Sequence, residues 1–346
     1  MTTIYIAMPD ALLVLRRHYG NWQVQRQLEG LPTQCVAADP QQPEHLYCGT
    51  FGRGLWRSQD AGATFQPVGE GIRSPQIMAV AVSHAERLGA YGVVYAGTEP
   101  SALYRSEDGG NTWRELASLL TLPSAPTWSF PPRPYTSHVR AIGLDPNQAG
   151  RLYVAIEAGA LVRSFDAGQT WEDRQPGGPF DTHTLGLPRQ APGRIYSAAG
   201  DGFMQPGQGF VESSDGGNTW ERPGAGLQQH YLWGLAVDPE NPETLIVSAA
   251  PGPQQAHNPL HAESAIYRRA SGENWQQVQE GLPPSREMLA STLAANEAEP
   301  GVFYAANNRG IYRSPDAGLT WERLAIAWPE HKDGSRPEGL LVCENG

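Results

Sequence analysis

Seven side chains of this sequence are of types that could bind or transform a ligand. When the repeated segments of the chain are aligned on an Asp-Pro turn, Arg140, His183 and Trp233 occupy equivalent positions in three of them. A cation, a titratable imidazole and an aromatic ring could together bind a carboxylate-bearing or sugar-like ligand. Four loop carboxylates are candidates for acid and base catalysis, namely Glu99, Glu157, Asp181 and Asp201. The distance between two carboxylates decides whether such a pair works, so the sequence leaves this choice open.

A further polar group, His257, His261 and Glu263, has the spacing H-x-x-x-H-x-E. On a helix the two histidines would share a face and could hold a metal ion. However, Pro259 lies between them and the surrounding sequence is typical of a loop. We therefore expect ordinary polar loop residues here, with no metal site and no cofactor. His257 and His261 stay candidates for contacting a ligand.

A repeated pattern, S-x-D-x-G-x-T-W, predicts a recurring turn in the scaffold that positions these side chains. It begins at Ser58, Ser106, Ser164, Ser213 and Ser314, with Phe65 replacing Trp in the first copy. The Asp carboxylate can accept backbone hydrogen bonds, the Gly permits a left-handed backbone angle, and the hydroxyl groups can tie the same turn. Because the Asp recurs in every copy, we interpret it as structural and not as a catalytic acid or metal ligand. The residues concerned are Asp60, Asp108, Asp166, Asp215 and Asp316.

The pattern resembles the Asp-box, or bacterial neuraminidase repeat, of β-propellers. Proteins that carry it include sialidases, xyloglucan-degrading hydrolases, the sortilin luminal domain and a photosystem II assembly factor. The resemblance implies an all-β fold of four-stranded antiparallel blades. It also implies that loops after the second strand of each blade share one face with the mouth of the central channel, while the Asp-boxes lie on the other face. Arg140, His183 and Trp233 would then lie near the channel mouth, either in a ligand site or as polar residues lining a water-filled channel.

The number of blades follows from the aromatic residues that end each repeat. Seven are found, namely Trp22, Phe65, Trp113, Trp171, Trp220, Trp275 and Trp321. The first unit begins at Ile4 without a first strand, and the segment from Gly339 to Asn345 resembles that strand. We expect the C-terminal strand to join the N-terminal blade, because closure removes an exposed sheet edge. The prediction is a single seven-bladed propeller domain over residues 1–346.

Composition argues against several classes of partner. The formal net charge of −11 disfavours nucleic-acid binding, which needs a basic surface. The three cysteines form no C-x-x-C pair and predict neither a disulfide scaffold nor a structural zinc site. The first residues lack the order of a signal peptide, and no apolar run is long enough to span a membrane. We therefore expect a cytoplasmic protein with no membrane partner.

Long loops that interrupt the repeat are expected to carry function. The loop 119–138 contains Trp128, Arg133 and Tyr135, and residues of these types dominate binding hot spots. The same loop could instead fold as a lid over the channel. Arg53 lies in another loop of the predicted channel face and is a further candidate for binding a ligand.

Two functions follow from the resemblance. The favoured one is non-catalytic binding of an unknown protein, peptide or carbohydrate-like ligand, because the photosystem assembly factor shows that one seven-bladed ring can act in this way. The alternative is a glycoside hydrolase, either sialidase-like or xyloglucanase-like. The sialidase signature F-R-I-P is absent, and residues 130–134 resemble it only loosely. Xyloglucan-degrading relatives pair two propellers around a cleft, whereas this chain has repeats for one.

Overall fold

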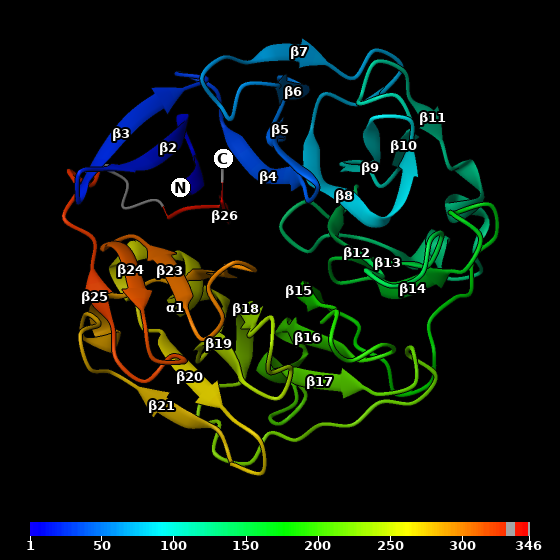
Figure 1. Ribbon diagram of the computed structural model, residues 1–346. Helices are drawn as coiled ribbons and strands as arrows, with labels where there is room; N and C mark the ends of the chain where they lie inside the picture. The colour runs from blue at the N-terminus through cyan, green and yellow to red at the C-terminus, as the bar shows by residue number, and fades with distance from the viewer. Residues whose placement is uncertain (330–335, 345–346) are drawn as a thin grey trace.

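The strands form seven antiparallel sheets around a central axis (Figure 1), in a computed structural model that describes residues 1–329 and 336–344. The first sheet contains, from the centre of the ring outward, β26 (Gly339–Glu344), β1 (Thr2–Met8), β2 (Ala11–His18) and β3 (Asn21–Gln27). In the same order, the other six sheets consist of β4 (Thr33–Asp39), β5 (Gln42–Thr50), β6 (Leu55–Ser58) and β7 (Gln66–Val68); β8 (Ile77–Leu88), β9 (Tyr91–Thr98), β10 (Leu103–Ser106) and β11 (Arg114–Glu115); β12 (Val139–Leu144), β13 (Leu152–Ile156) and β14 (Ala160–Ser164); β15 (Thr182–Gly186), β16 (Ile195–Ala199) and β17 (Phe210–Ser213); β18 (Tyr231–Val237), β19 (Leu245–Ala250), β20 (Ala265–Arg269) and β21 (Gln276–Val278); and β22 (Thr292–Ala295), β23 (Phe303–Asn307), β24 (Gly310–Ser314) and β25 (Glu322–Arg323). The predicted all-β, seven-bladed propeller is confirmed.

Strand β26 closes the ring, as the sequence predicted. It pairs antiparallel with β1, so that Val342 lies opposite Ile4 and Glu344 opposite Thr2. One blade therefore combines the first and last strands of the described chain. Asn345, which was included in the predicted closing strand, lies outside the described residues.

Two blades depart from the four-stranded template. The sheets β12–β14 and β15–β17 each have three strands, and a single isolated bridge stands where the fourth strand was expected. These bridges join Arg163 to Glu172 and Glu212 to Glu221. In both blades the chain turns away soon after the bridge, so it does not remain alongside its neighbour for long enough to form a ladder.

The apolar core lies between neighbouring sheets and is built largely from their second strands. All five residues of β13 are buried, as are all six of β19. Six second strands carry a buried tyrosine, and some of these hydroxyl groups donate to the backbone of the next blade. Tyr5 donates to Ala61 O at 2.9 Å, and Tyr153 donates to Gly216 O at 3.1 Å. A tyrosine ring can thus fill the space between blades while its polar end is satisfied.

The repeated Asp residues fold their own turns. In the turn that contains Asp215, its carboxylate accepts hydrogen bonds from the Ser213 hydroxyl, from Thr219 N at 2.9 Å and from the Thr219 hydroxyl at 2.7 Å. The Ser213 hydroxyl in turn accepts from Gly217 N, and Gly217 has a φ of 85°. The other four copies repeat the bonds from Ser and Thr to Asp and from Gly to Ser. The structural interpretation of these residues is therefore correct.

This geometry predicts an acid-sensitive contribution to stability. The backbone and side-chain hydrogen bonds from Thr219 lower the pKa of Asp215 to about 2, below the value of about 3.9 in an unfolded chain. The contribution is therefore present above about pH 4 and is lost as the pH falls toward 2. Asp215→Ala should lower the free energy of unfolding at pH 7 by about 1–2 kcal/mol, because solvent-exposed hydrogen bonds each contribute little. Urea unfolding at several pH values measures this, with Ser214→Ala as the control in the same turn. A difference from wild type that stayed constant down to pH 2 would contradict the prediction.

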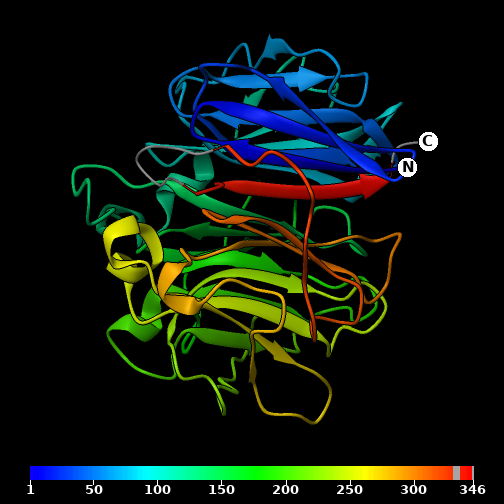
Figure 2. The ribbon, with the colours of Figure 1, turned by 90° about the vertical axis from the view of Figure 1, so that its left-hand side faces the viewer.

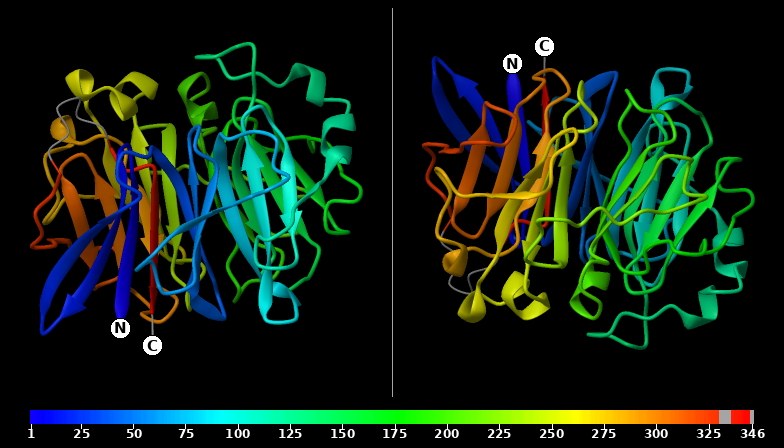
Figure 3. Two further views of the ribbon diagram at one scale, coloured as in Figure 1. Left: turned by 90° about the horizontal axis from the view of Figure 1, so that it is seen from above. Right: turned by 90° about the horizontal axis from the view of Figure 1, so that it is seen from below.

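The irregular segments gather on one face of the ring. Short helices interrupt the loops: η1 (Ala117–Thr121), η2 (Ala125–Thr127), η3 (Gly200–Phe203), α1 (Pro253–His257), η4 (Pro259–His261) and η5 (Ser285–Glu287). Figures 2 and 3 show α1 in yellow and η3 in green on the face opposite to the one where the N- and C-termini lie. Within the described residues, every helix is too short or too polar to cross a bilayer.

Candidate functional site

A cavity of about 960 Å³ lies where the innermost strands of several blades begin. Four of its lining residues share the position obtained by aligning the repeats: Gln34 on β4, Met78 on β8, Arg140 on β12 and Trp233 on β18. The rest of its lining is Phe130, Pro131, Pro132, Arg133, His138, Glu157, Ala158, Gly178, Phe180, Asp181, Gly200, Asp201, Phe203, Met204, Gln205, Gln208, Arg222, Tyr231, Pro253, His257, Arg336 and Glu338. The cavity thus combines acidic groups, guanidinium groups and aromatic rings.

A second cavity, of about 420 Å³, lies near the opposite ends of β15 and β18. Its acidic residues are Glu240, Glu297 and Asp238, and Glu297 lies 3.2 Å from His84 Nε2. Asp238 accepts hydrogen bonds from the backbone nitrogens of Glu240, Asn241 and Gly301. That carboxylate holds turns together, as expected for an Asp-Pro turn. We therefore place the candidate site in the larger cavity.

Arg140, His183 and Trp233 come together, although in different environments. The guanidinium carbon of Arg140 lies 4.3 Å from the centre of the Trp233 ring, and that of Arg336 lies 4.1 Å from it. The His183 ring is 4.6 Å from the Trp233 ring, and its side chain is only 1% exposed. Arg140 and Trp233 line the cavity, whereas His183 lies behind its surface. Their role in binding a ligand stays a prediction.

Glu157 follows β13 directly, and it is held by basic residues. Its Oε2 lies 2.8 Å from His138 Nε2 and 3.6 Å from Arg140 Nε. Burial opposes the ionised form of Glu157, but the hydrogen bond from His138 and the nearby guanidinium group of Arg140 hold its pKa far below its usual value. These contacts favour the ionised form of Glu157 in the cavity wall.

Asp181 and Asp201 belong to the next blade and are fixed by backbone groups. Asp181 Oδ1 accepts from Ala158 N at 2.8 Å. Asp201 Oδ2 accepts from Phe180 N at 3.0 Å and from Asp181 N at 3.2 Å, and burial raises the pKa of Asp201 above its usual value. Close packing here requires Gly200, because a Cβ at that position would lie 2.1 Å from Asp181 Oδ2.

Glu99 does not line the cavity. It is 5% exposed, and both of its oxygens accept hydrogen bonds from Arg133, at 2.7 and 2.6 Å. The Arg133 guanidinium also lies 4.8 Å from the Phe130 ring. This bidentate ion pair fixes the loop 119–138 beside the cavity, so Glu99 has a positioning role and Arg133 belongs to the cavity wall.

The remaining predicted residues are spread around this centre. Trp128 is 8% exposed, packs in an apolar cluster and donates from Nε1 to Ser124 Oγ at 3.0 Å, so it is a core residue. Tyr135 is 85% exposed, and Arg53 and His261 are exposed and lie outside the cavity lining. His257 lines the cavity, and its Nε2 lies 2.9 Å from the Tyr231 hydroxyl. Burial holds the pKa of His257 far below its usual value.

Sequence reasoning missed several lining residues that a simple extension would have found. His138 and Tyr231 stand two residues before Arg140 and Trp233, and both line the cavity. Asp181, two residues before His183, also lines the cavity and was already a candidate. Phe180 and Phe203, which are 43% and 51% exposed, carried no comparable signal because they lie in irregular loops. Arg336 likewise lies between strands, outside any repeat.

No family model matches this chain. Its curated relatives are enzymes. The chain is 26% identical over 314 residues to an oligoxyloglucan-reducing end-specific xyloglucanase of Emericella nidulans, which covers 74% of this chain and 35% of that protein. It is 27% identical over 222 residues to a xyloglucanase of a Paenibacillus species, a match that covers 54% of this chain and 20% of that protein. The chain therefore spans a fifth to about a third of the length of these relatives.

Solved structures show the same fold at lower identity. The GH74 enzyme of Niastella koreensis superposes with a TM-score of 0.68 at 18% identity, over 92% of this chain and 52% of that one. YCF48 bound to a D1 peptide superposes with a TM-score of 0.57 at 16% identity, over 85% of this chain and 81% of that one. These likenesses establish the propeller fold, with GH74 xyloglucanases among its neighbours.

The comparisons correct the favoured interpretation of the sequence. A non-catalytic binding module was preferred, yet the sequence relatives described above are xyloglucan-degrading enzymes, and a third xyloglucanase, from Hypocrea jecorina, is 28% identical over 213 residues. The preference rested on the single ring and on the photosystem assembly factor, and neither excludes catalysis. The findings favour the alternative, a glycoside hydrolase.

Proposed function

We propose that this propeller hydrolyses glycosidic bonds in xyloglucan-type oligosaccharides bound in the large cavity. The observation that carries the proposal is the meeting of three carboxylates, from two neighbouring blades, in one cavity of a chain whose curated relatives degrade xyloglucan. The volume of about 960 Å³ lies at the upper end of the range of about 300–1,000 Å³ for small-molecule sites. Exposed rings such as Phe180 and Phe203 could pack against the apolar faces of sugars.

The environments of two carboxylates suit different parts of this reaction. Glycoside hydrolysis needs a carboxylic acid that protonates the leaving oxygen and an ionised carboxylate that acts as base or stabilises positive charge. Burial raises the pKa of Asp201 above its usual value, despite the backbone hydrogen bonds from Phe180 N and Asp181 N, and so favours a neutral carboxyl group. Glu157 contacts His138 and Arg140, which favour the ionised form. We assign Asp201 as the acid and Glu157 as the ionised partner.

The five repeated turns also support assignment to a narrower structural class. We also infer that the five turns belong to the Asp-box class, because each has the same bonds from Ser and Thr to Asp and a glycine with positive φ. This inference concerns the scaffold, and the proposed chemistry does not depend on it.

Turnover and binding can be measured on the same protein. The purified chain should release new reducing ends from xyloglucan oligosaccharides, and the product is quantified by chromatography. Binding of the same sugars should change the tryptophan fluorescence, because Trp233 lines the cavity. Unbranched cello-oligosaccharides distinguish a xyloglucan specificity from a general one for β-glucans. Absence of both new reducing ends and a saturable fluorescence change would overturn the proposal.

A further inference from the structure

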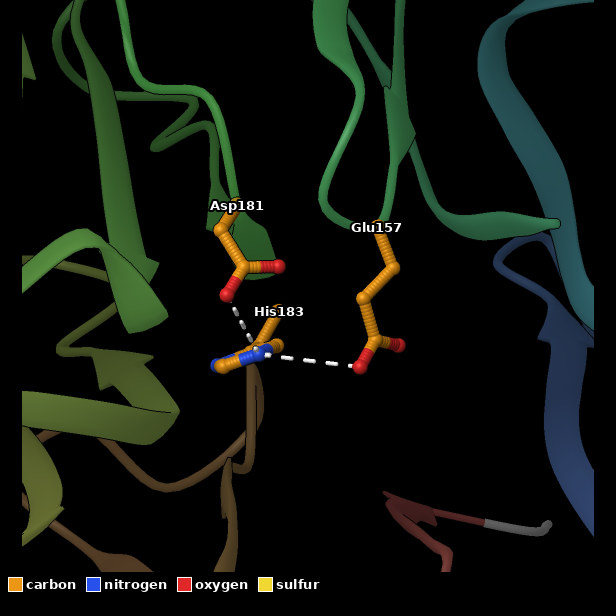
Figure 4. A group of neighbouring side chains, drawn as sticks. All are labelled: Glu157, Asp181 and His183. Carbon is orange, nitrogen blue, oxygen red and sulfur yellow. Dashed lines mark ion pairs between the residues drawn. The ribbon is translucent and has the colours of Figure 1, made fainter. Parts of the chain in front are cut away.

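Three potential metal ligands converge in the wall of the cavity (Figure 4). His183 Nε2 lies 3.7 Å from Asp181 Oδ2 and 3.8 Å from Glu157 Oε1. One ligand atom from each residue lies within 4.8 Å of the other two, a grouping found among the described residues. The residues come from the loop after β13 and from the beginning of β15, so two adjacent blades contribute to the cluster.

Each of these side chains is anchored through its other polar atom. Glu157 is held through Oε2 by His138, and Asp181 is held through Oδ1 by Ala158 N. His183 Nδ1 lies 2.6 Å from Leu232 O. A carbonyl oxygen only accepts, so Nδ1 carries the proton and Nε2 of the neutral imidazole presents a lone pair. An imidazole fixed in this way by a backbone carbonyl is typical of a metal-binding histidine.

The free atoms therefore face one another without a hydrogen-bond donor among them. His183 Nε2 is buried in a side chain only 1% exposed, and it has no hydrogen-bond partner. An unpaired buried polar atom costs free energy and requires an explanation. A proton on Nε2 would not give this atom a partner. Asp181 Oδ2 at 3.7 Å and Glu157 Oε1 at 3.8 Å are too far away to accept a hydrogen bond from it. A positive ion placed between the three atoms could contact all of them.

We propose that Glu157, Asp181 and His183 bind a divalent transition-metal ion of the Zn²⁺ or Mn²⁺ type. Ligand atoms about 2.1 Å from a tetrahedral ion lie roughly 3.4 Å apart, so small side-chain movements would bring these three into place. One imidazole and two carboxylates suit such ions better than Mg²⁺ or Ca²⁺, which prefer oxygen alone. Three protein ligands leave a fourth position for water or a ligand from the cavity.

This inference goes beyond the proposed hydrolysis and does not depend on it, although Glu157 belongs to both. A bound cation would neutralise the Glu157 carboxylate and occupy Oε1. We therefore expect Zn²⁺ to inhibit turnover and EDTA to restore it. Zinc binding without any turnover would leave the metal site standing, and turnover without zinc binding would overturn the metal site alone.

The test is calorimetric titration of EDTA-treated, dialysed protein with ZnCl₂ and, separately, MnCl₂. The wild type should bind about one ion per chain, and the ion should raise its melting temperature. His183→Asn places an amide where Nδ1 stood, so it can still donate to Leu232 O while Nε2 is removed. Its affinity should fall by more than about 100-fold. Asp181→Asn, which keeps an acceptor for Ala158 N, should give a similar loss.

The control is His257→Asn, which removes another, half-buried cavity histidine that lies outside the cluster. It should bind the ion as the wild type does. The proposal is overturned if the wild type binds neither ion, or if His183→Asn and Asp181→Asn both keep the wild-type affinity. The second result would assign the binding to exposed side chains such as His261.

Discussion

Replacing Asp201 with Asn should lower the turnover of xyloglucan oligosaccharides by about 10²–10⁴-fold, the contribution of a positioned general acid. The amide oxygen of Asn can still accept hydrogen bonds from Phe180 N and Asp181 N, so the loop should keep its conformation. What the variant loses is the proton that the leaving oxygen requires. Initial rates at saturating substrate give the loss in kcat, and fluorescence titration shows whether substrate binding is retained.

The matched control is Asp173→Asn. Asp173 also accepts hydrogen bonds from a backbone nitrogen and a hydroxyl group, both of Ser124, but it lies outside the cavity lining. Its turnover should stay within about threefold of the wild type, as expected for a residue remote from the chemistry. If Asp201→Asn retained wild-type turnover, the assignment of the acid would be wrong and Asp181 would become the next candidate.

The fold could be predicted from the sequence because its determinants are local and repeated. A turn such as Ser213 to Trp220 specifies its own hydrogen bonds, and a buried tyrosine in the second strand connects one blade to the next. The two three-stranded sheets were not predicted. Whether a fourth strand continues beyond Glu172 or Glu221 depends on where the following loop leads, and no local pattern encodes that.

The site was predictable only where the repeat positions it. Arg140 and Trp233 were found because they share one position of the repeat, and Glu157 because it lies in a loop of the predicted channel face; all three line the cavity. Trp128 was chosen by residue type from an irregular loop, and it proved to be a core residue. The metal-binding geometry was missed because it needs a distance between side chains on two blades. The spacing His257-x-x-x-His261 instead drew attention to an exposed histidine.

Ring closure should be the most sensitive feature of the fold. Val342 is 6% exposed and packs with Ile4, Ile6 and Leu15, so Val342→Asp would place a carboxylate in this apolar cluster. The variant loses the burial of the valine side chain and must also desolvate or protonate the new carboxyl group. We expect the free energy of unfolding, measured with urea, to fall by about 4 kcal/mol or more.

A second substitution in the same strand distinguishes the effect of opening the ring from the effect of losing a single contact of β26. Glu344 forms an ion pair of 2.9 Å with the Met1 amino group, and both groups are partly exposed to solvent. Glu344→Gln should therefore cost less than about 1 kcal/mol. If Val342→Asp frees β26 from β1, the exposed edge of β1 should also promote association, which light scattering would detect. A Val342→Asp protein as stable and monomeric as Glu344→Gln would mean that the ring does not depend on its terminal strand, because the pairing of β1 with β2 and their packing against the neighbouring blades would then suffice to hold β1 in place.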